Sequence, residues 1–314
     1  MNKSLENKIL IISGATASGK SSLAFEIAKR QNSVIINADA MQIYQGLPIL
    51  SAQPDAIFQN QVHHFLYSYL SPFEKGSVAL WLDCAVKIIK QALNEGKLPI
   101  VVGGSGMYID KLINGISLVP EIDGMINEEA NNLFYKLGKD NFLENLILMG
   151  DADASNVLDK QRLIRRYEVL LQTGKSLSFW QSNDINKFFA DSQFLHFNLN
   201  LSKPEVYKNC NDRFLLMIKS GAIEEVERFF DIYRDVVFSQ KLPIIKTLGF
   251  NEIACFLGLD GYQKIDYNKL VELASQKTRN YAKRQITWFK NQKLQQIFFD
   301  STPLSMEYFL GLLQ

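Results

Sequence analysis

The sequence predicts an α/β protein, in which a parallel β-sheet flanked by helices is interrupted by a helical subdomain. Short, unbroken apolar runs such as Ile9–Ile12, Ser33–Asn37 and Leu98–Val102 are typical of strands that are buried on both faces of a parallel sheet. From Glu121 to about Ala190 no such run occurs, and helical patterns with polar interruptions replace it. A chain of 314 residues with 47% hydrophobic content is long enough for both parts.

The first apolar run leads into a glycine-rich turn. Gly14, four further residues, Gly19, Lys20 and Ser21 follow Ile9–Ile12 and precede an amphipathic segment. This spacing in a strand–turn–helix context indicates a phosphate-binding loop and a P-loop NTPase-like core, with an ordinary glycine turn as the alternative. Lys20 would hold the terminal phosphates, and the Ser21 hydroxyl would bind Mg²⁺. The residues expected to bind a diphosphate or nucleotide are Gly14, Ala15, Thr16, Ala17, Ser18, Gly19, Lys20 and Ser21.

The residues at the ends of the next two strands help to predict the type of reaction. Strand Ser33–Asn37 brings Asp39 to its C-terminal end, where ligands bind in open α/β sheets. Strand Leu98–Val102 ends in the glycines of LPIVVGGSG, where a nucleotide triphosphatase usually has an acidic residue that helps to hold Mg²⁺. Asp39 is therefore predicted to act as a base on a second substrate, and a role as a simple loop cap is the alternative.

The remaining periodicities predict further helices and strands. Val78–Asn94 is predicted to be a helix, His63–Tyr69 a short strand and Gln193–Leu201 a core strand. We expect the chain after Lys246 to be helical to its end. The other predicted helices are Ile126–Leu137, Asp140–Leu148 and Leu158–Gln172 in the insertion, and Asn209–Ser220 and Ile223–Tyr233 after it, broken at Gly221.

Composition constrains the partners and the compartment. The formal net charge of +1 indicates no partner, but two basic segments, Lys160–Lys175 and Lys277–Lys293, are candidate nucleic-acid contacts, with solvated helix faces as the alternative. The three cysteines are far apart, and with three histidines they form no local zinc motif. No apolar span approaches 18 residues, so we expect a soluble, cytoplasmic protein.

Seven motifs follow one another along the chain: GATASGKS, ADAMQIY, HHFLYSYLSP, LPIVVGGSGMY, QRLIRRYEVLLQTGKSLS, DRFLLMIKSGAIEEV and TRNYAKRQITWFK. In these motifs and in their order, the chain resembles the tRNA dimethylallyltransferases, also called tRNA isopentenyltransferases, almost from end to end. A phosphate loop alone is shared by many kinases and ATPases, whereas the GGSGMY segment and the last motif are far more specific.

The resemblance implies an enzyme that transfers a dimethylallyl group from dimethylallyl diphosphate to N6 of the adenosine immediately 3′ of the anticodon. The implied tRNAs read codons that begin with U, diphosphate is released, and Mg²⁺ is the implied cofactor. The resemblance also implies a cytoplasmic monomer without a membrane association or an obligate protein partner. Residues 1–120 and 191–314 would form the catalytic core, and residues 121–190 an inserted tRNA-binding subdomain.

The resemblance also assigns roles to individual residues. The implied catalytic set is Lys20, Ser21, Asp39 and Arg213, with Asp39 taking the N6 proton and Arg213 contacting the diphosphate. The implied tRNA contacts are Asp39, Ala40, Met41, Gln42, Ser105, Asn127, Gln161, Arg162, Leu163, Ile164, Arg165, Lys246, Thr247, Leu248, Gly249, Phe250, Lys283, Arg284, Gln285, Ile286, Thr287, Trp288, Phe289 and Lys290.

Several positions depart from the family pattern, and two other functions compete with the transferase. Ala15 replaces a proline, Ala40 a serine, Gln53 a lysine, and both Asn127 and Asn209 an arginine, which bears on tRNA affinity and rate more than on reaction class. One alternative is a kinase of the same core fold, but a kinase has no use for the C-terminal basic helix. The other is a non-catalytic RNA-binding module, against which the retained Lys20 and Asp39 argue.

Overall fold

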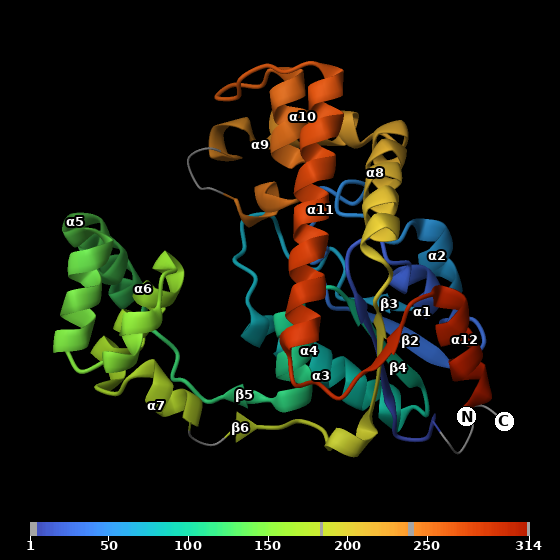
Figure 1. Ribbon diagram of the computed structural model, residues 1–314, viewed down its shortest axis with the longest axis horizontal. Coiled ribbons are helices and arrows are strands. Elements are labelled where there is room, and N and C mark those ends of the chain that lie inside the picture. The colour runs from blue at the N-terminus through green and yellow to red at the C-terminus, as the bar shows by residue number, and fades with distance from the viewer. Residues whose placement is uncertain (1–4, 183–184, 238–241, 313–314) are drawn as a thin grey trace. The chain divides into compact units, whose positions relative to one another are not determined.

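The computed structural model describes residues 5–182, 185–237 and 242–312 (Figure 1). The chain divides into two compact units. The larger unit consists of Met1–Ile113 and Phe189–Gln314, and the smaller, helical unit consists of Asn114–Phe188. Among the described residues, no helix is both long enough and apolar enough to span a membrane.

A six-stranded parallel sheet forms the centre of the larger unit. Its strands are β1 (Ile9–Gly14), β2 (Ser33–Asn37), β3 (His64–Phe65), β4 (Leu98–Gly103), β7 (Phe194–Leu199) and β8 (Ile297–Phe299), in the order β3-β2-β4-β1-β7-β8. Leu10 of β1 lies opposite Ile100 of β4 on one side and Leu195 of β7 on the other. Because β1 is an inner strand, every one of its residues is buried, which explains its continuous apolar run.

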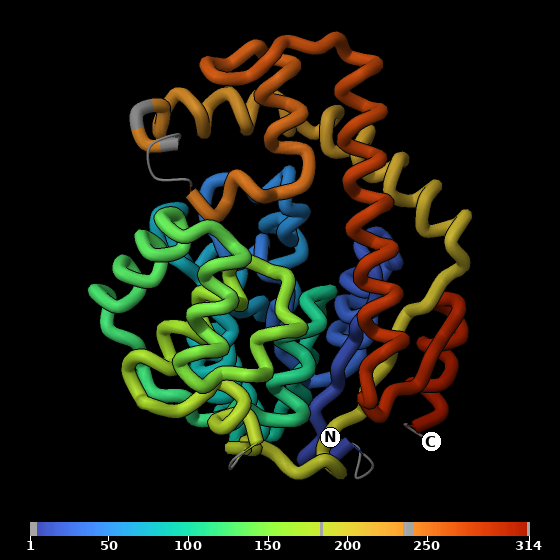
Figure 2. Tube along the Cα trace, turned by 60° about the vertical axis from the view of Figure 1, so that its left-hand side comes forward, coloured from blue at the N-terminus to red at the C-terminus, as the bar shows by residue number. Residues whose placement is uncertain are grey.

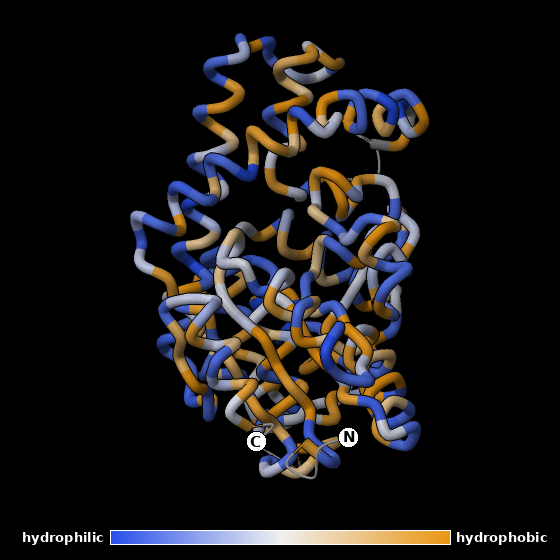
Figure 3. The backbone as a smooth tube through the Cα atoms, turned by 90° about the vertical axis from the view of Figure 1, so that its right-hand side faces the viewer, coloured by the Kyte–Doolittle hydropathy of each residue, from blue (hydrophilic) through white to orange (hydrophobic). Residues whose placement is uncertain are grey.

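Helices cover both faces of this sheet. On one face, alternate strand residues such as Ile12 and Ile100 share a hydrophobic cluster with α1 (Lys20–Ala28) and α12 (Thr302–Gly311). On the other face, α3 (Val78–Asn94) packs on β2 and β4, and the Trp81 indole Nε1 donates a hydrogen bond of 2.6 Å to the Asn37 carbonyl. Figure 3 shows hydrophobic and hydrophilic residues alternating along the helices.

The larger unit contains further helices. They are α2 (Ala56–Gln61), α4 (Gly106–Asn114), α8 (Lys203–Lys219), α9 (Ala222–Val237), α10 (Phe250–Leu257) and α11 (Tyr267–Asn291), with a short 3₁₀ turn at Pro243–Lys246. The long helix α11 packs along α8 and also contacts β1, as Figures 1 and 2 show. Helix α11 therefore reaches the strand that carries the glycine-rich turn.

The helical unit has its own core. Its elements are β5 (Ile116–Ser117), α5 (Gly124–Leu148), the 3₁₀ turn Ala152–Asn156, α6 (Lys160–Thr173), α7 (Leu177–Ser182) and β6 (Ile185–Asn186), with β5 and β6 antiparallel. Phe142, Leu146 and Leu163 belong to one buried cluster between α5 and α6. Arg166 is buried in a bidentate pair with Asp151, at 2.5 and 2.7 Å, so this cation of the basic segment is not free to contact RNA.

The predicted fold class is confirmed, and two local predictions are wrong. The chain after Lys246 is not wholly helical, because Ile297–Phe299 forms β8 and pairs in parallel with β7. Helix α8 begins at Lys203 and not at Asn209, since the Ser202 hydroxyl caps it by accepting from Glu205 N at 3.4 Å, and Pro204 follows in the first turn. The predicted break inside the insertion falls at Gly138, where α5 is kinked with φ of 74°.

Candidate active site

The turn between β1 and α1 has the backbone geometry of an anion cradle. Ala17 and Gly19 have φ of 62° and 87°, which turns successive N–H groups toward one side. A Cβ atom at Gly14 would lie 2.8 Å from the Leu199 carbonyl oxygen, so only glycine fits there. Gly19, Lys20 and Ser21 line an open pocket of about 390 Å³ in front of the turn. This arrangement can receive a phosphate group at the N-terminus of α1.

Lys20 is held inside this turn. It is the first residue of α1, is 9% exposed, and donates from Nζ to the Ala15 carbonyl at 3.1 Å. Burial lowers the pKa of Lys20 to about 8, the nearby Arg213 adds to the effect, and Asp39 opposes it. Burial disfavours the charged ammonium, and an anion bound beside it would favour it again.

Asp39 follows the C-terminal end of β2. Its Oδ1 accepts a hydrogen bond of 2.9 Å from the Met41 N–H, and its own N–H donates to Asn37 Oδ1 at the same distance. Within the part of the chain that the structure describes, Oδ2 accepts no hydrogen bond. Asp39 thus caps its loop with one oxygen and keeps the other available, so the two roles expected from the sequence are compatible.

Arg213 reaches the phosphate loop from α8. Its Nη1 donates to the Thr16 hydroxyl at 3.0 Å, and burial lowers its pKa while the charge of Asp39 opposes that shift. Asn209, one turn earlier on α8, donates to the Ala17 carbonyl at 3.2 Å. The asparagine that replaces an arginine therefore still contacts the loop.

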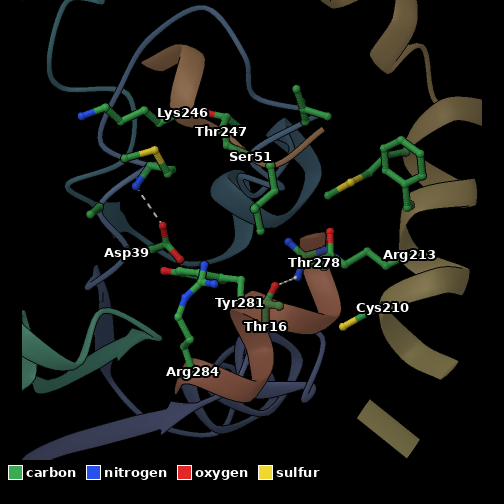
Figure 4. Close-up of a pocket in the computed structure, with 16 residues that line it drawn as sticks. Thr16, Asp39, Ser51, Cys210, Arg213, Lys246, Thr247, Thr278, Tyr281 and Arg284 are labelled. Carbon is green, nitrogen blue, oxygen red and sulfur yellow. Dashed lines mark hydrogen bonds between the residues drawn. The ribbon is translucent and has the colours of Figure 1, made fainter. Parts of the chain in front are cut away.

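Thr16 of the phosphate loop, Asp39 and Arg213 line one cavity of about 290 Å³, whereas Lys20 lines the open pocket in front of the turn. Figure 4 shows Asp39 entering the cavity from one side and Arg213 from the other, with Thr16 and Tyr281 between them. Tyr281 comes from α11, and burial raises its pKa, so its hydroxyl stays protonated. The rest of the lining is largely apolar, with Leu50, Phe214 and Met217 among its residues. A small hydrocarbon group would fit between the loop and the carboxylate.

The glycine that ends β4, Gly103, is required by its close contact with the neighbouring backbone. A Cβ atom at Gly103 would lie 2.0 Å from the Ala38 carbonyl oxygen, so an acidic residue cannot occupy this strand end. Ser105 follows in the same loop, and its Oγ accepts from Ala40 N at 2.9 Å. The loop after β4 therefore supports the segment that carries Asp39.

The structure separates the expected tRNA contacts of the larger unit into exposed, half-buried and interior residues. Lys246, Lys283, Arg284, Thr287 and Lys290 are exposed. The half-buried residues are Ala40, Met41, Ser105, Leu248, Ile286 and Trp288. Of these, Met41 and Leu248 line the cavity, and Ala40 lines both the cavity and a second pocket. Gln42 is half-buried and donates to the Ser51 and Ala52 carbonyls. The interior residues of the set are Thr247, Gly249, Phe250, Gln285 and Phe289.

The expected contacts in the helical unit divide in the same way. Gln161 and Arg162 are exposed on α6, and Arg165 is half-buried with Nη1 3.3 Å from Glu168 Oε2. Leu163 and Ile164 belong to the hydrophobic cluster of the unit. Asn127 donates to the Glu168 carboxylate, so its side chain is already engaged.

Sequence reasoning missed several residues of the site. Tyr281 and Thr278 line the cavity; both belong to the motif TRNYAKRQITWFK, and Tyr281 precedes Arg284 by about one helical turn. Glu225 of α9 accepts from the N–H groups of Ile49 and Leu50 at 2.8 Å each and so holds a loop that lines the cavity. Burial raises the pKa of Glu225.

A parallel sheet flanked by helices, with a phosphate loop whose Thr16 shares a cavity with the Asp39 carboxylate, defines this chain as a P-loop protein. The comparisons with known proteins refine this class. A family model described as IPP transferase matches residues 42–292. The tRNA dimethylallyltransferases of Ehrlichia chaffeensis and Ehrlichia ruminantium are 38% and 40% identical to this chain, and each match covers 96% of it and 96% and 98% of the relative, respectively.

Solved structures agree on the fold. The chain is similar to a eukaryotic dimethylallyltransferase acting on tRNA, with a TM-score of 0.79 at 24% identity over 95% of this chain and 75% of that one. This likeness supports the fold. The chain belongs to the IPP transferase family, as its motifs predict, and it is an enzyme of that family.

Proposed function

We propose that this protein transfers the dimethylallyl group of dimethylallyl diphosphate to N6 of the adenosine immediately 3′ of the anticodon, in tRNAs that read codons beginning with U. The observation that carries the proposal is that the phosphate loop, Arg213 and Asp39 meet at one cavity with apolar walls. Membership in the IPP transferase family supports the same reaction.

The diphosphate is the leaving group in this scheme. The loop N–H groups, the Lys20 ammonium and the Arg213 guanidinium would surround it and stabilise the charge that grows as the allylic C–O bond breaks. The electron pair of that bond stays on the diphosphate oxygen. Lys20 is pre-positioned by the Ala15 carbonyl, and Arg213 by Thr16, so little reorganisation is needed during the reaction.

Asp39 is the base. The adenine N6 attacks the allylic carbon and becomes positively charged, and Asp39 accepts its proton on Oδ2. Oδ1 remains bound to Met41 N–H, which fixes the direction of the carboxylate. The target base must leave its stack to reach this cavity, as in other enzymes that modify nucleobases.

The donor groups at the loop fit a magnesium ion that is held mainly by its substrate. The described residues contain no cluster of three or more His, Cys, Asp or Glu side chains that could bind a metal. Mg²⁺ commonly binds substrate phosphates and water with few protein ligands, and the exposed Ser21 hydroxyl beside Lys20 offers one. When bound, the ion would neutralise charge on the diphosphate.

The exposed cations are proposed to bind the anticodon arm. In the larger unit these are Lys246, Lys283, Arg284 and Lys290, and in the helical unit Gln161 and Arg162 present polar groups on α6. Phosphate contacts of this kind set affinity and register. We propose residues 121–190 as the subdomain that grips the tRNA, and a cytoplasmic monomer as the active form, as the resemblance of the sequence motifs implies.

A labelling experiment tests the proposed reaction. The protein is incubated with Mg²⁺ and unmodified tRNA, once with radiolabelled dimethylallyl diphosphate and once with ATP labelled at the γ-phosphate. We expect label from the allylic substrate in the tRNA and no consumption of ATP. Transfer or release of the γ-phosphate without allylic labelling would instead indicate a kinase or an ATPase.

A further inference from the structure

The side chain of Gln285 links two glycine-rich loops inside the larger unit. Its Oε1 accepts a hydrogen bond of 2.7 Å from the Thr16 N–H in the phosphate loop, and its Nε2 donates to the Gly104 carbonyl at 2.9 Å in the loop after β4. The residue is only 6% exposed. Gln285 lies in the helix that is expected to contact tRNA, yet its side chain points to the sheet and not to solvent.

These two bonds belong to a longer chain of contacts that crosses the site. At one end, Arg213 donates to the Thr16 hydroxyl. At the other end, Ser105 accepts from Ala40 N through its Oγ and donates its own N–H to the Ala38 carbonyl at 3.1 Å. Ala38 and Ala40 flank the proposed base, Asp39. Gln285 thus stands midway between the group that holds the diphosphate and the group that takes the proton.

The packing around Gln285 leaves little freedom. A Cβ atom at Gly104 would lie 2.2 Å from Gln285 Nε2, and one at Gly106 would lie 2.1 Å from the Trp288 ring of the same helix. The glycines of this loop therefore allow α11 to approach closely enough for both hydrogen bonds. A carboxamide is also the group that can accept on one atom and donate from the other in this geometry.

We propose that Gln285 is a positioning residue that fixes the separation between the phosphate loop and the Asp39 segment. By accepting from Thr16 N–H it also occupies one loop amide, so the diphosphate is left to the amides that follow, from Ala17 to Ser21. The link is a statement about this chain alone, whereas its effect on rate rests on the proposed function. A displacement of about 1 Å between reacting groups can slow a reaction by about a hundredfold.

Two substitutions of similar size test the link. Gln285→Met fills the same space without a hydrogen bond. Gln285→Glu keeps an acceptor for Thr16 N–H but, when ionised, sets an oxygen against the Gly104 carbonyl; once protonated, it regains a donor. Gln276→Met, on an exposed position of the same helix, is the matched control. Thermal melts confirm that each variant is folded.

The first measurement needs no substrate. Hydrogen exchange of the Thr16 amide, followed in a peptide that spans residues 14–20, should be faster in Gln285→Met than in the wild type and unchanged in Gln276→Met. Unchanged exchange in Gln285→Met would show that the link does not exist. Faster exchange in Gln285→Met, combined with a wild-type protein that transfers no allylic group, would support the link and count against the proposed reaction.

The second measurement is single-turnover transfer with both substrates saturating. Gln285→Met should be slower by about tenfold to a hundredfold at every pH, with tRNA affinity within about twofold of the wild type. For Gln285→Glu, the rate relative to wild type should recover as the pH falls from about 8 to about 6, because the protonated acid restores the donor. Full rates in both variants, or a loss confined to tRNA affinity, would overturn the positioning role.

Discussion

The buried ammonium of Lys20 should make the affinity for the proposed substrate, dimethylallyl diphosphate, depend on pH. The pKa of Lys20 in the free protein is lowered to about 8, mainly by burial and then by Arg213. A bound diphosphate favours the ammonium, so it raises that pKa again. Below pH 8 the Lys20 amine is mostly protonated already, so the diphosphate binds without proton uptake. Above pH 8 the amine is mostly neutral, so binding of the diphosphate is accompanied by proton uptake.

The size of the effect follows from the pKa. The protonated fraction of Lys20 falls from about 0.9 at pH 7 to about 0.1 at pH 9, so the dissociation constant should rise about tenfold over this interval. The same argument predicts uptake of about 0.9 proton per diphosphate bound at pH 9 and of about 0.1 at pH 7.

Calorimetry without tRNA, at constant Mg²⁺ and in two buffers of different ionisation enthalpy, measures both quantities. Lys20→Met is the control, because it has a similar length but no titrating group, while the ionisation of the ligand affects both proteins alike. The wild-type affinity should fall relative to that of Lys20→Met as the pH rises. Parallel pH profiles for the two proteins would refute the assignment of Lys20 to the diphosphate.

Three further predictions concern other groups. Arg213→Lys keeps a charge but loses the guanidinium fork, so calorimetry should show dimethylallyl diphosphate binding weakened by about 1.5–3 kcal/mol; an unchanged affinity would remove Arg213 from the site. Burial lowers the pKa of His196 to about 3 from 6.5, so the unfolded chain binds a proton that the folded one does not, and stability should fall by about 2 kcal/mol from pH 7 to pH 5. In denaturant titrations, His196→Gln should lack this fall in the free energy of unfolding between pH 7 and pH 5. An equal fall in both proteins would contradict the lowered pKa of His196. The double variant Lys283→Ala, Arg284→Ala should weaken tRNA binding and reduce the slope of log K against log salt by about two units, whereas equal slopes would remove these cations from the RNA surface.

The phosphate loop and Asp39 could be predicted because their signals are local. Position 14 requires glycine because a Cβ atom there would clash with the Leu199 backbone, and position 19 requires glycine because its φ is positive. The spacing of the two glycines in the motif therefore follows from backbone geometry. Asp39 follows a buried strand by two residues, which places it at the ligand-binding edge of any parallel sheet. These features need no knowledge of the rest of the chain.

The missed features depend on contacts between distant segments. Strand β8 has three residues at the edge of the sheet, too few to show a period, and its pairing with β7 defines it. The start of α8 carried a signal, since Ser202 and Pro204 are a cap and a first-turn proline, but the following residues are mostly polar. The contact from Gln285 to Thr16 spans 269 positions, and no local pattern reports it.

The basic segments show a third reason for error. A cation in a sequence pattern carries no information about burial: Arg166 is buried against Asp151, whereas Arg162 on the same helix is exposed. The same limit applies to the tRNA contacts implied by the motif at the end of α11, where Lys283 and Arg284 are exposed and the adjacent Gln285 is buried. The packing of α11 on β1 determines which of these adjacent residues is buried.

The most direct test of the central claim is the single-turnover rate of dimethylallyl transfer by Asp39→Asn, with enzyme and dimethylallyl diphosphate in excess over labelled tRNA. An amide keeps an acceptor for Met41 N–H but cannot take the N6 proton, so the rate should fall by about 10²- to 10⁴-fold while tRNA affinity stays within a few-fold of the wild type. Transfer by the Asn variant at the wild-type rate would contradict the assignment of Asp39 as the base.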